Sequence, residues 1–356
     1  MSSISTLIHS CNPFLYILYP ISLLFRAVTR TRRWLYQCGV FTQTKVAVPV
    51  IVVGNISVGG TGKTPLVISL ANLLISQGFK PGIITRGYKS KSKSYPLVVN
   101  DSSIAAQVGD EALLLQRHSH CPVIVDPIRV RAANYLLQHY SCDIILSDDG
   151  LQHYALARDI EIAVVDAARG FGNGLCLPAG PLREPVSRLQ DVDFIINNVG
   201  RAHVPALGSD TMSVPQSTEG EGTKLFTYSM YLQPQKFLNL SSKEQQDAAF
   251  FQHKTLHAIA GIGNPQRFFQ TLKDLGLTAN LHAFPDHHAF TAADIDFGAD
   301  AIVIMTEKDA VKCKDFADKR HWYLPVTAQL QQGFAQQFFS KLSQQTVASS
   351  LHTKKS

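Results

Sequence analysis

The stretch GNISVGGTGKTP, at residues 54–65, decides the fold of this sequence. It follows the apolar run VAVPVIVV at 46–53, which predicts a buried strand. The segment that comes next, 64–78, has the apolar spacing of a helix and ends at Gly78. A glycine-rich turn between a strand and a helix is typical of a P-loop, whose backbone N–H groups surround phosphate oxygens. We therefore expect a core of the P-loop NTPase type.

Each residue type in this loop has a chemical use. Glycine lets the backbone approach a phosphate, lysine reaches the terminal phosphates, and the hydroxyl after it binds Mg²⁺. The usual pattern begins with glycine, whereas this sequence has serine in that position. The alternative is an ordinary glycine-rich turn. We expect nucleotide phosphates to be bound by Ser57, Val58, Gly59, Gly60, Thr61, Gly62, Lys63 and Thr64.

The rest of the first half of the chain repeats this strand–helix rhythm. Helix-like segments lie at 110–118 and 128–140. Short apolar runs of strand length occur at 82–85, 122–125, 143–147, 161–165 and 193–197. Strands that alternate with helices predict a parallel sheet with helices on both faces. The fold class is therefore α/β.

The character of the sequence changes near residue 200. Residues 201–225 are polar, and 224–240 look extended, with a turn at Gln233-Pro234, before the α/β rhythm resumes at 255. We expect a smaller C-terminal α/β lobe joined to the core by a β-ribbon. The expected divisions are an amphipathic, membrane-associated helix at 1–42, a P-loop core at 43–222, the ribbon and smaller lobe at 223–345, and a disordered tail at 346–356.

Charge is distributed unevenly along the chain. The formal net charge is +6, yet the first 100 residues contain eleven Lys or Arg and no Asp or Glu. Such a segment suits an anionic partner: nucleic acid, a membrane surface or a phosphorylated substrate. Nucleic acid is the least favoured of these, because the arginine-rich stretch 26–36 has no interleaved aromatic stacking residues beyond Trp34 and Tyr36. The six cysteines show no metal-binding spacing and fit a reducing compartment.

The N-terminal region has the pattern of a helix that lies in a membrane interface. The apolar run FLYILYPISLLF at 14–25 is too short to span a bilayer and contains Pro20. It is followed by the arginine-rich stretch 26–34. Apolar bulk followed by arginines is typical of an interfacial helix. The alternative is a helix that packs on the core with its arginines in solvent.

Two acidic residues follow a predicted strand in SDDGLQH, residues 147–153. The carboxyl ends of parallel strands are where α/β folds bind ligands. We expect Asp148 or Asp149 to hold Mg²⁺ beside Thr64, as in phosphoryl-transfer enzymes. The alternative is a pair of turn or helix-capping aspartates. His153 is either a partner of this site or a polar surface residue.

A third motif, VGDE at 108–111, lies at a helix start. Its acids either complement the helix dipole or supply a general base that takes a hydroxyl proton during attack on a phosphate.

Three further motifs each allow two interpretations. In FPDHHAFT at 284–291, Asp286 is placed to orient a histidine, or the motif is a capped helix start. Arg183, in PAGPLREP, either clamps a phosphate or lies in a rigid turn. TEKDAVK at 306–312 serves lobe packing or nucleotide contact.

Taken in order, VGGTGKTP, TRGY, VGDE, DDGLQH, PAGPLREP, FPDHH and TEKDAVK resemble the motifs of the tetraacyldisaccharide 4'-kinases, the lipid A 4'-kinases of Gram-negative bacteria. The resemblance runs from about residue 10 to about residue 340. It implies that ATP, with Mg²⁺, phosphorylates the 4'-hydroxyl of a tetraacyl glucosamine disaccharide 1-phosphate to give a 1,4'-bisphosphate lipid A precursor. It also implies a location on the cytoplasmic face of the bacterial inner membrane and no obligate protein partner.

The same resemblance implies residue roles. Asp110 would be the base, paired with His287, although the neighbouring His288 leaves open which histidine faces Asp110. Lys63 and Asp149 would also be catalytic. The metal ligands would be Thr64, Asp148 and Asp149, and Arg183 would lie near the nucleotide phosphates.

Two other functional classes compete with a lipid kinase. One is a P-loop GTPase switch. The sequence argues against it, because it contains no Asn-Lys-x-Asp motif, the signature of guanine binding. The other is a membrane ATPase or scaffold that has no lipid acceptor. A two-lobed kinase is expected to close around ATP, because closure excludes water from the transferred phosphoryl group.

Overall fold

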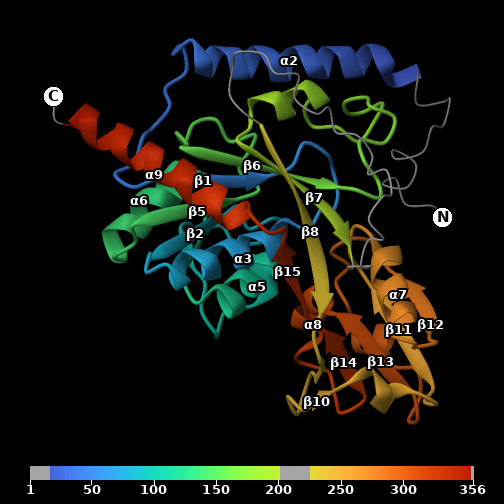
Figure 1. Cartoon of the computed structure of the whole chain (residues 1–356). Helices are drawn as coiled ribbons and strands as arrows, with labels where there is room; N and C mark the ends of the chain where they lie inside the picture. The colour runs from blue at the N-terminus through green and yellow to red at the C-terminus, as the bar shows by residue number, and fades with distance from the viewer. Residues whose placement is uncertain (1–16, 201–224, 354–356) are drawn as a thin grey trace.

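The computed structural model describes residues 17–200 and 225–353 and contains two α/β lobes (Figure 1). The larger lobe is built on a nine-stranded sheet in which the strands from β8 to β4 are parallel, while β15 and β3 are antiparallel edge strands. Its spatial order is β15 (Val326–Leu330), β8 (Phe226–Pro234), β7 (Phe194–Gly200), β6 (Ile160–Asp166), β1 (Val50–Gly54), β5 (Ile144–Asp148), β2 (Pro81–Thr85), β4 (Val123–Val125) and β3 (Leu97–Val98).

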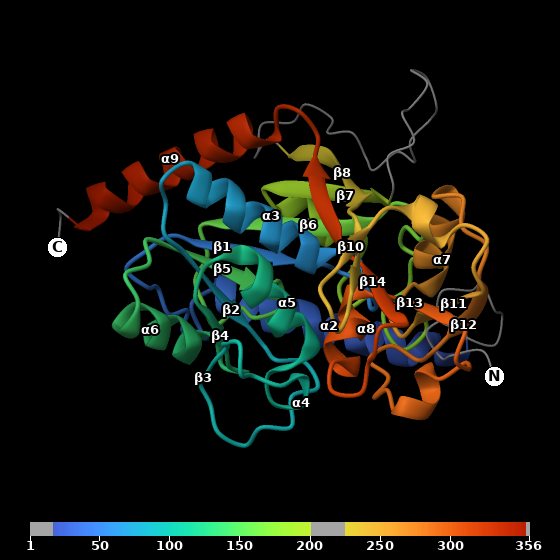
Figure 2. The same cartoon turned by 90° about the horizontal axis from the view of Figure 1, so that it is seen from below.

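Helices cover both faces of this sheet. One face packs against α3 (Lys63–Ser76), α5 (Asp110–Ser119) and α9 (Phe334–Thr353), which lie on the near side in Figure 2. The other face packs against α6 (Arg129–His139) and receives Phe25 from α2 (Tyr19–Gln37). Two short helices, α4 (Ala105–Val108) and the 3₁₀ helix η2 (Val186–Asp191), lie in connections. The expected fold class is confirmed.

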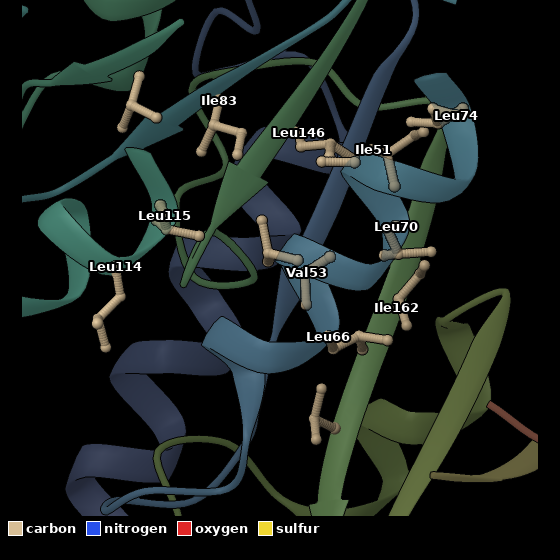
Figure 3. Close-up of a cluster of buried hydrophobic side chains, with 14 of the residues drawn as sticks. Ile51, Val53, Leu66, Leu70, Leu74, Ile83, Leu114, Leu115, Leu146 and Ile162 are labelled. Atoms are coloured by element: carbon tan, nitrogen blue, oxygen red, sulfur yellow. The ribbon is translucent and has the colours of Figure 1, made fainter. Parts of the chain in front are cut away.

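The central strand β1 shows why the sequence takes this form. Ile51 and Val53 belong to the core beneath α3 (Figure 3), whereas Val50 and Val52 belong to the core on the opposite face. Alternate side chains of a strand point to opposite faces, so a strand covered on both sides must be apolar at every position. That is why residues 50–53 are all apolar; the strand begins at Val50, four residues later than the predicted run 46–53.

The smaller lobe has a six-stranded sheet with its own core. The strands, in spatial order, are β10 (Gln245–Gln246), β9 (Phe237–Asn239), β14 (His321–Leu324), β13 (Ile302–Thr306), β11 (Leu256–Ala260) and β12 (Asn280–Ala283). Its helices are α7 (Pro265–Asp274), α8 (Glu307–Cys313), η3 (Ala248–Phe251) and η4 (Ala292–Ile295). Leu256, Ile304 and Trp322 are among the buried residues of this core.

The two lobes are joined by an antiparallel pair of strands, β8 leading out of the core and β15 leading back. The predicted turn at Gln233-Pro234 is not found: both residues end β8, where they pair with Thr327 and Val326 of β15. The next strand, β9, enters the other sheet. The expected division gave residues 223–345 to the ribbon and the smaller lobe together, whereas the last strand of the smaller sheet along the chain is β14, which ends at Leu324. β15 belongs to the large sheet and α9 packs on it, so the smaller lobe does not extend to residue 345.

The structure places a helix near each end of the chain, α2 at Tyr19–Gln37 and α9 at Phe334–Thr353. Residues 1–16 and 354–356 lie outside the described part, as does the polar stretch 201–224. Pro20 does not interrupt a helix but lies in the first turn of α2, where its missing N–H costs no hydrogen bond. The helix α9 continues to Thr353, so residues 346–353 are helical rather than a disordered tail.

Candidate active site

The P-loop connects the end of β1 to α3, as the sequence predicts. Gly62 has a φ of 94°, and a β-carbon there would lie 2.3 Å from the side-chain nitrogen of Asn198. That amide, on β7, donates a 2.8 Å hydrogen bond to the carbonyl of Thr61. Only glycine fits this left-handed, crowded position. The neighbouring sheet therefore fixes the loop immediately before Lys63.

A cavity of about 660 Å³ lies between the two lobes, next to this loop. On the core side it is lined by residues 60–65 and by Glu111. On the smaller lobe it is lined by residues 262–264 and 306–308, and apolar side chains including Phe268 and Leu324 complete its wall. A cleft with backbone N–H groups at one end and apolar walls elsewhere suits a nucleotide, which has a charged and a flat apolar end.

The two aspartates of SDDGLQH have opposite environments. Asp149 is 3.4 Å from Lys63 Nζ and 3.1 Å from Arg183 Nη1. Its burial acts to raise the pKa, but these two cations outweigh burial, so the pKa of Asp149 is lowered. Burial, followed by the charges of Glu111 and Asp149, raises the pKa of Asp148 to about 7. Asp149 is thus a fixed anion between two cations.

Asp148 has a carboxylate oxygen that could coordinate a cation. Thr85 donates a 3.1 Å hydrogen bond to Oδ2, whereas Oδ1 is buried and has no hydrogen-bond partner within residues 17–200 and 225–353. No group of three or more His, Cys, Asp or Glu side chains arranged for a metal occurs in that same part of the chain. Mg²⁺ is commonly held by one or two carboxylates together with phosphates and water. The unpaired oxygen therefore fits a Mg²⁺ that arrives with a nucleotide.

Asp110 begins α5 and meets a histidine from the other lobe. Its oxygens lie 3.1 and 3.2 Å from His287 Nδ1, and both side chains are largely buried. On the far side of the ring, Lys308 Nζ is 3.2 Å from Nε2. Burial acts to raise the pKa of Asp110, but the hydrogen bond from His287 and the charge of Lys308 outweigh it and lower the pKa. Asp110 is therefore held as a carboxylate.

The local backbone decides which of the two histidines faces Asp110. His287 has a φ of 59°, and its N–H donates to the carbonyl of Gly261, which turns its side chain toward the core lobe. His288 instead lies 3.3 Å from Asp294 in the smaller lobe and packs against Phe284. The sequence alone leaves these neighbours indistinguishable.

Sequence reasoning missed Lys308 as an individual residue, although it included TEKDAVK as a motif. Its Nζ is 3.0 Å from Glu111 Oε1 and 4.0 Å from Asp110 Oδ2. It occurs two residues after the end of β13, at the carboxyl edge of the smaller sheet. Because α/β folds place functional side chains at that edge, the position of Lys308 just after a predicted strand could have identified it.

The family model described as "Tetraacyldisaccharide-1-P 4'-kinase" matches residues 14–343. The chain belongs to this family. A relative from Nitrosococcus oceani, named "Tetraacyldisaccharide 4'-kinase", is 45% identical, and the match covers 97% of this chain and 96% of the relative. A relative of the same name from Legionella pneumophila strain Corby is 48% identical, and the match covers 92% of this chain and 94% of the relative.

A solved structure supports the same assignment to the 4'-kinase family. It is titled as the "apo" form of LpxK from Aquifex aeolicus in complex with ATP. It is 28% identical to this chain, with a TM-score of 0.74, and the match covers 92% of this chain and 99% of that one. The resemblance read from the motifs is thereby confirmed, as is the two-lobed fold.

Proposed function

We propose that this member of the 4'-kinase family transfers the γ-phosphoryl group of ATP to the 4'-hydroxyl of a tetraacyl glucosamine disaccharide 1-phosphate. The product would be the 1,4'-bisphosphate precursor of lipid A. The observation that carries this function is the buried Asp110–His287 pair, which lies beside the P-loop cleft in a chain of this family. A nucleotide switch has no use for a hydroxyl-activating pair, whereas a kinase with a sugar acceptor does.

The hydrogen-bond partners of His287 define its role. An ammonium group is only a donor, so Lys308 donates to Nε2 of His287 and that nitrogen carries no hydrogen. Nδ1 then carries the ring hydrogen and donates it to Asp110. His287 therefore orients the carboxylate, and Asp110 takes the proton of the 4'-hydroxyl as the new O–P bond forms. A low-pKa carboxylate accepts that proton late in the step, when the hydroxyl has become acidic.

The remaining side chains serve the nucleotide. Lys63 and the P-loop N–H groups would hold the terminal phosphates, and Arg183 would keep Asp149 in place when Lys63 turns to the nucleotide. Thr64 and Asp148, with Asp149 close by, would hold Mg²⁺, which supplies charge stabilisation to the transferred group.

The helix α2 is proposed to place the chain on the cytoplasmic face of the bacterial inner membrane. Ser22 anchors the helix by donating a 2.7 Å hydrogen bond to the carbonyl of Cys176. Ile21, Leu24 and Val28 share one face of the helix and are more than half exposed. In the described part of the chain, no helix has the length and apolar character needed to cross a bilayer. An exposed apolar face beside arginines suits an interfacial helix.

Replacing both Ile21 and Leu24 by glutamate should lower binding to vesicles that contain anionic lipid by on the order of tenfold or more, because two apolar side chains no longer enter the interface. Vesicle flotation measures the bound fraction. Ile75→Glu is the matched control, since Ile75 is also an exposed apolar helix residue but lies on α3. If the control loses as much binding as the α2 variant, α2 is not the membrane contact.

The proposed reaction is tested with γ-labelled ATP, Mg²⁺ and a detergent-solubilised acyl-disaccharide 1-phosphate. Label should appear in the lipid, should depend on that lipid and should be greater with ATP than with GTP. Label that appears only as free phosphate, at the same rate with and without lipid, would identify an ATPase instead. A preference for GTP would identify the switch.

A further inference from the structure

A buried carboxylate at the lobe junction is shared by two arginines. Asp166, the last residue of β6, is 2% exposed. It lies 3.0 Å from Nε of Arg169 in the core lobe and 2.6 Å from Nη2 of Arg267, which is on α7 of the smaller lobe. Figure 1 shows α7 close to the end of the large sheet. A charge this well buried and doubly paired strongly favours the arrangement in which both arginines are present.

Arg169 extends this contact to the P-loop. One guanidinium nitrogen donates a 3.2 Å hydrogen bond to the carbonyl of Gly263 in the smaller lobe, and the other donates to the carbonyl of Gly60 in the P-loop. At the same point the two backbones touch, since a β-carbon added at Gly263 would lie 2.6 Å from the nitrogen of Gly60. The P-loop and the smaller lobe are thus joined both by the Arg169 side chain and by close approach of their backbones.

The active-site pair depends on how the lobes are docked. Asp110 belongs to the core lobe, whereas His287 and Lys308 belong to the smaller lobe. Any rotation of the smaller lobe about the β8–β15 ribbon changes the distance from His287 to Asp110. A contact that fixes the docking therefore also fixes the orientation of the base.

We propose that Asp166, Arg169 and Arg267 form a clasp that holds the smaller lobe on the P-loop and thereby aligns His287 with Asp110. They are positioning residues, since they act on the reaction through the docking of the lobes. This inference rests on the proposed function, because alignment matters only if Asp110 and His287 act on the acceptor. None of the three is among the residues that the motifs of this chain singled out.

A double-mutant cycle tests the clasp. We expect Asp166→Asn to lower kcat by on the order of 30-fold, because two half-buried arginines lose their buried charged partner. In a His287→Ala background the same change should cost less than about threefold, since there is no histidine left to align. Equal losses in both backgrounds would overturn the proposal. Asp247→Asn, which removes an exposed carboxylate 3.5 Å from Lys236, is the control and should stay near wild type.

A second variant avoids the buried charges. Gly263→Ala removes no charged side chain but adds a β-carbon against the backbone of Gly60, so the lobes cannot dock as closely. We expect on the order of tenfold lower kcat, again only where His287 is present. If Asp166→Asn does not fold, the proposal is tested with Gly263→Ala instead. An unchanged kcat in Gly263→Ala would overturn the proposed clasp.

Small-angle scattering separates the clasp from the proposed reaction. With a non-hydrolysable ATP analogue, Asp166→Asn or Gly263→Ala should have a larger radius of gyration than wild type, whether or not the protein phosphorylates a lipid. Unlabelled lipid in the wild-type assay would contradict the function alone. Identical scattering from wild type and both variants would contradict the clasp alone.

Discussion

Asp110→Asn should lower kcat for lipid phosphorylation by about 10³-fold and leave ATP affinity nearly unchanged. Asparagine keeps the shape of the side chain and still accepts a hydrogen bond from His287, but it cannot take a proton from the 4'-hydroxyl. Asp110 is not part of the cavity wall that would hold the nucleotide, although its neighbour Glu111 is. Label transfer from γ-labelled ATP measures kcat, and equilibrium titration with an ATP analogue measures affinity.

The control for this variant is Asp101→Asn, because Asp101 is an exposed carboxylate in the same lobe that accepts a 3.1 Å hydrogen bond from Gln116. It should retain wild-type activity. If Asp110→Asn also phosphorylated lipid at the wild-type rate, Asp110 would be a helix-start residue and the base would lie elsewhere. Loss of ATP affinity together with kcat would instead assign Asp110 to nucleotide binding.

The pKa of Asp110 adds a pH dependence to this expectation. Because its pKa lies below the ordinary value of 3.8, the carboxylate remains the base at every pH above that value. The rate should therefore not fall between pH 8 and pH 6 through protonation of Asp110. Removing the hydrogen bond and charge that oppose burial, as in His287→Ala with Lys308→Ala, should raise the pKa of Asp110 and move the acid limb of the rate profile to higher pH.

The sequence predicts the core of the fold well because the local signals agree with the tertiary structure. The central strand β1 is an unbroken apolar run, and the P-loop has glycines where a left-handed backbone and a close neighbour require them. β15 was missed because VTAQL is short and half-buried, and its partner β8 lies about 100 residues earlier in the chain. Nothing local shows that the chain returns to the first sheet after building the second.

The candidate site is predictable only in part, for the same reason. Motifs identify which residue types are present, but the contact between Asp110 and His287 joins residues 177 positions apart, and that between Asp166 and Arg267 joins residues 101 positions apart. Both contacts cross the lobe junction, so they exist only once two separately folded cores have docked. Even the choice between His287 and His288 depends on a backbone turn that is held by the carbonyl of Gly261.

Lys63→Ala should lower kcat/KM for ATP by on the order of 10³-fold, because it removes the only side-chain cation within the P-loop itself. Lys63 Nζ is held ready by Asn55 Oδ1 at 3.3 Å and by Asp149 Oδ1 at 3.4 Å, so its position is fixed before a nucleotide arrives. Initial rates over a range of ATP concentrations measure the effect. Lys80→Ala, an exposed lysine of the same lobe, should have no effect.

Arg183→Ala distinguishes the two cations that share Asp149. If Lys63 turns to the phosphates and Arg183 keeps Asp149 in place, the arginine variant should lose only about tenfold, since it weakens one charged contact beside the nucleotide. The opposite order, with Arg183→Ala far worse than Lys63→Ala, would mean that the arginine binds the phosphates and the lysine positions Asp149. Lys63 and Arg183 both lie within 3.4 Å of the Asp149 carboxylate, so these distances do not show which of them binds the phosphates. The side chain whose removal lowers activity more is the one that binds the phosphates.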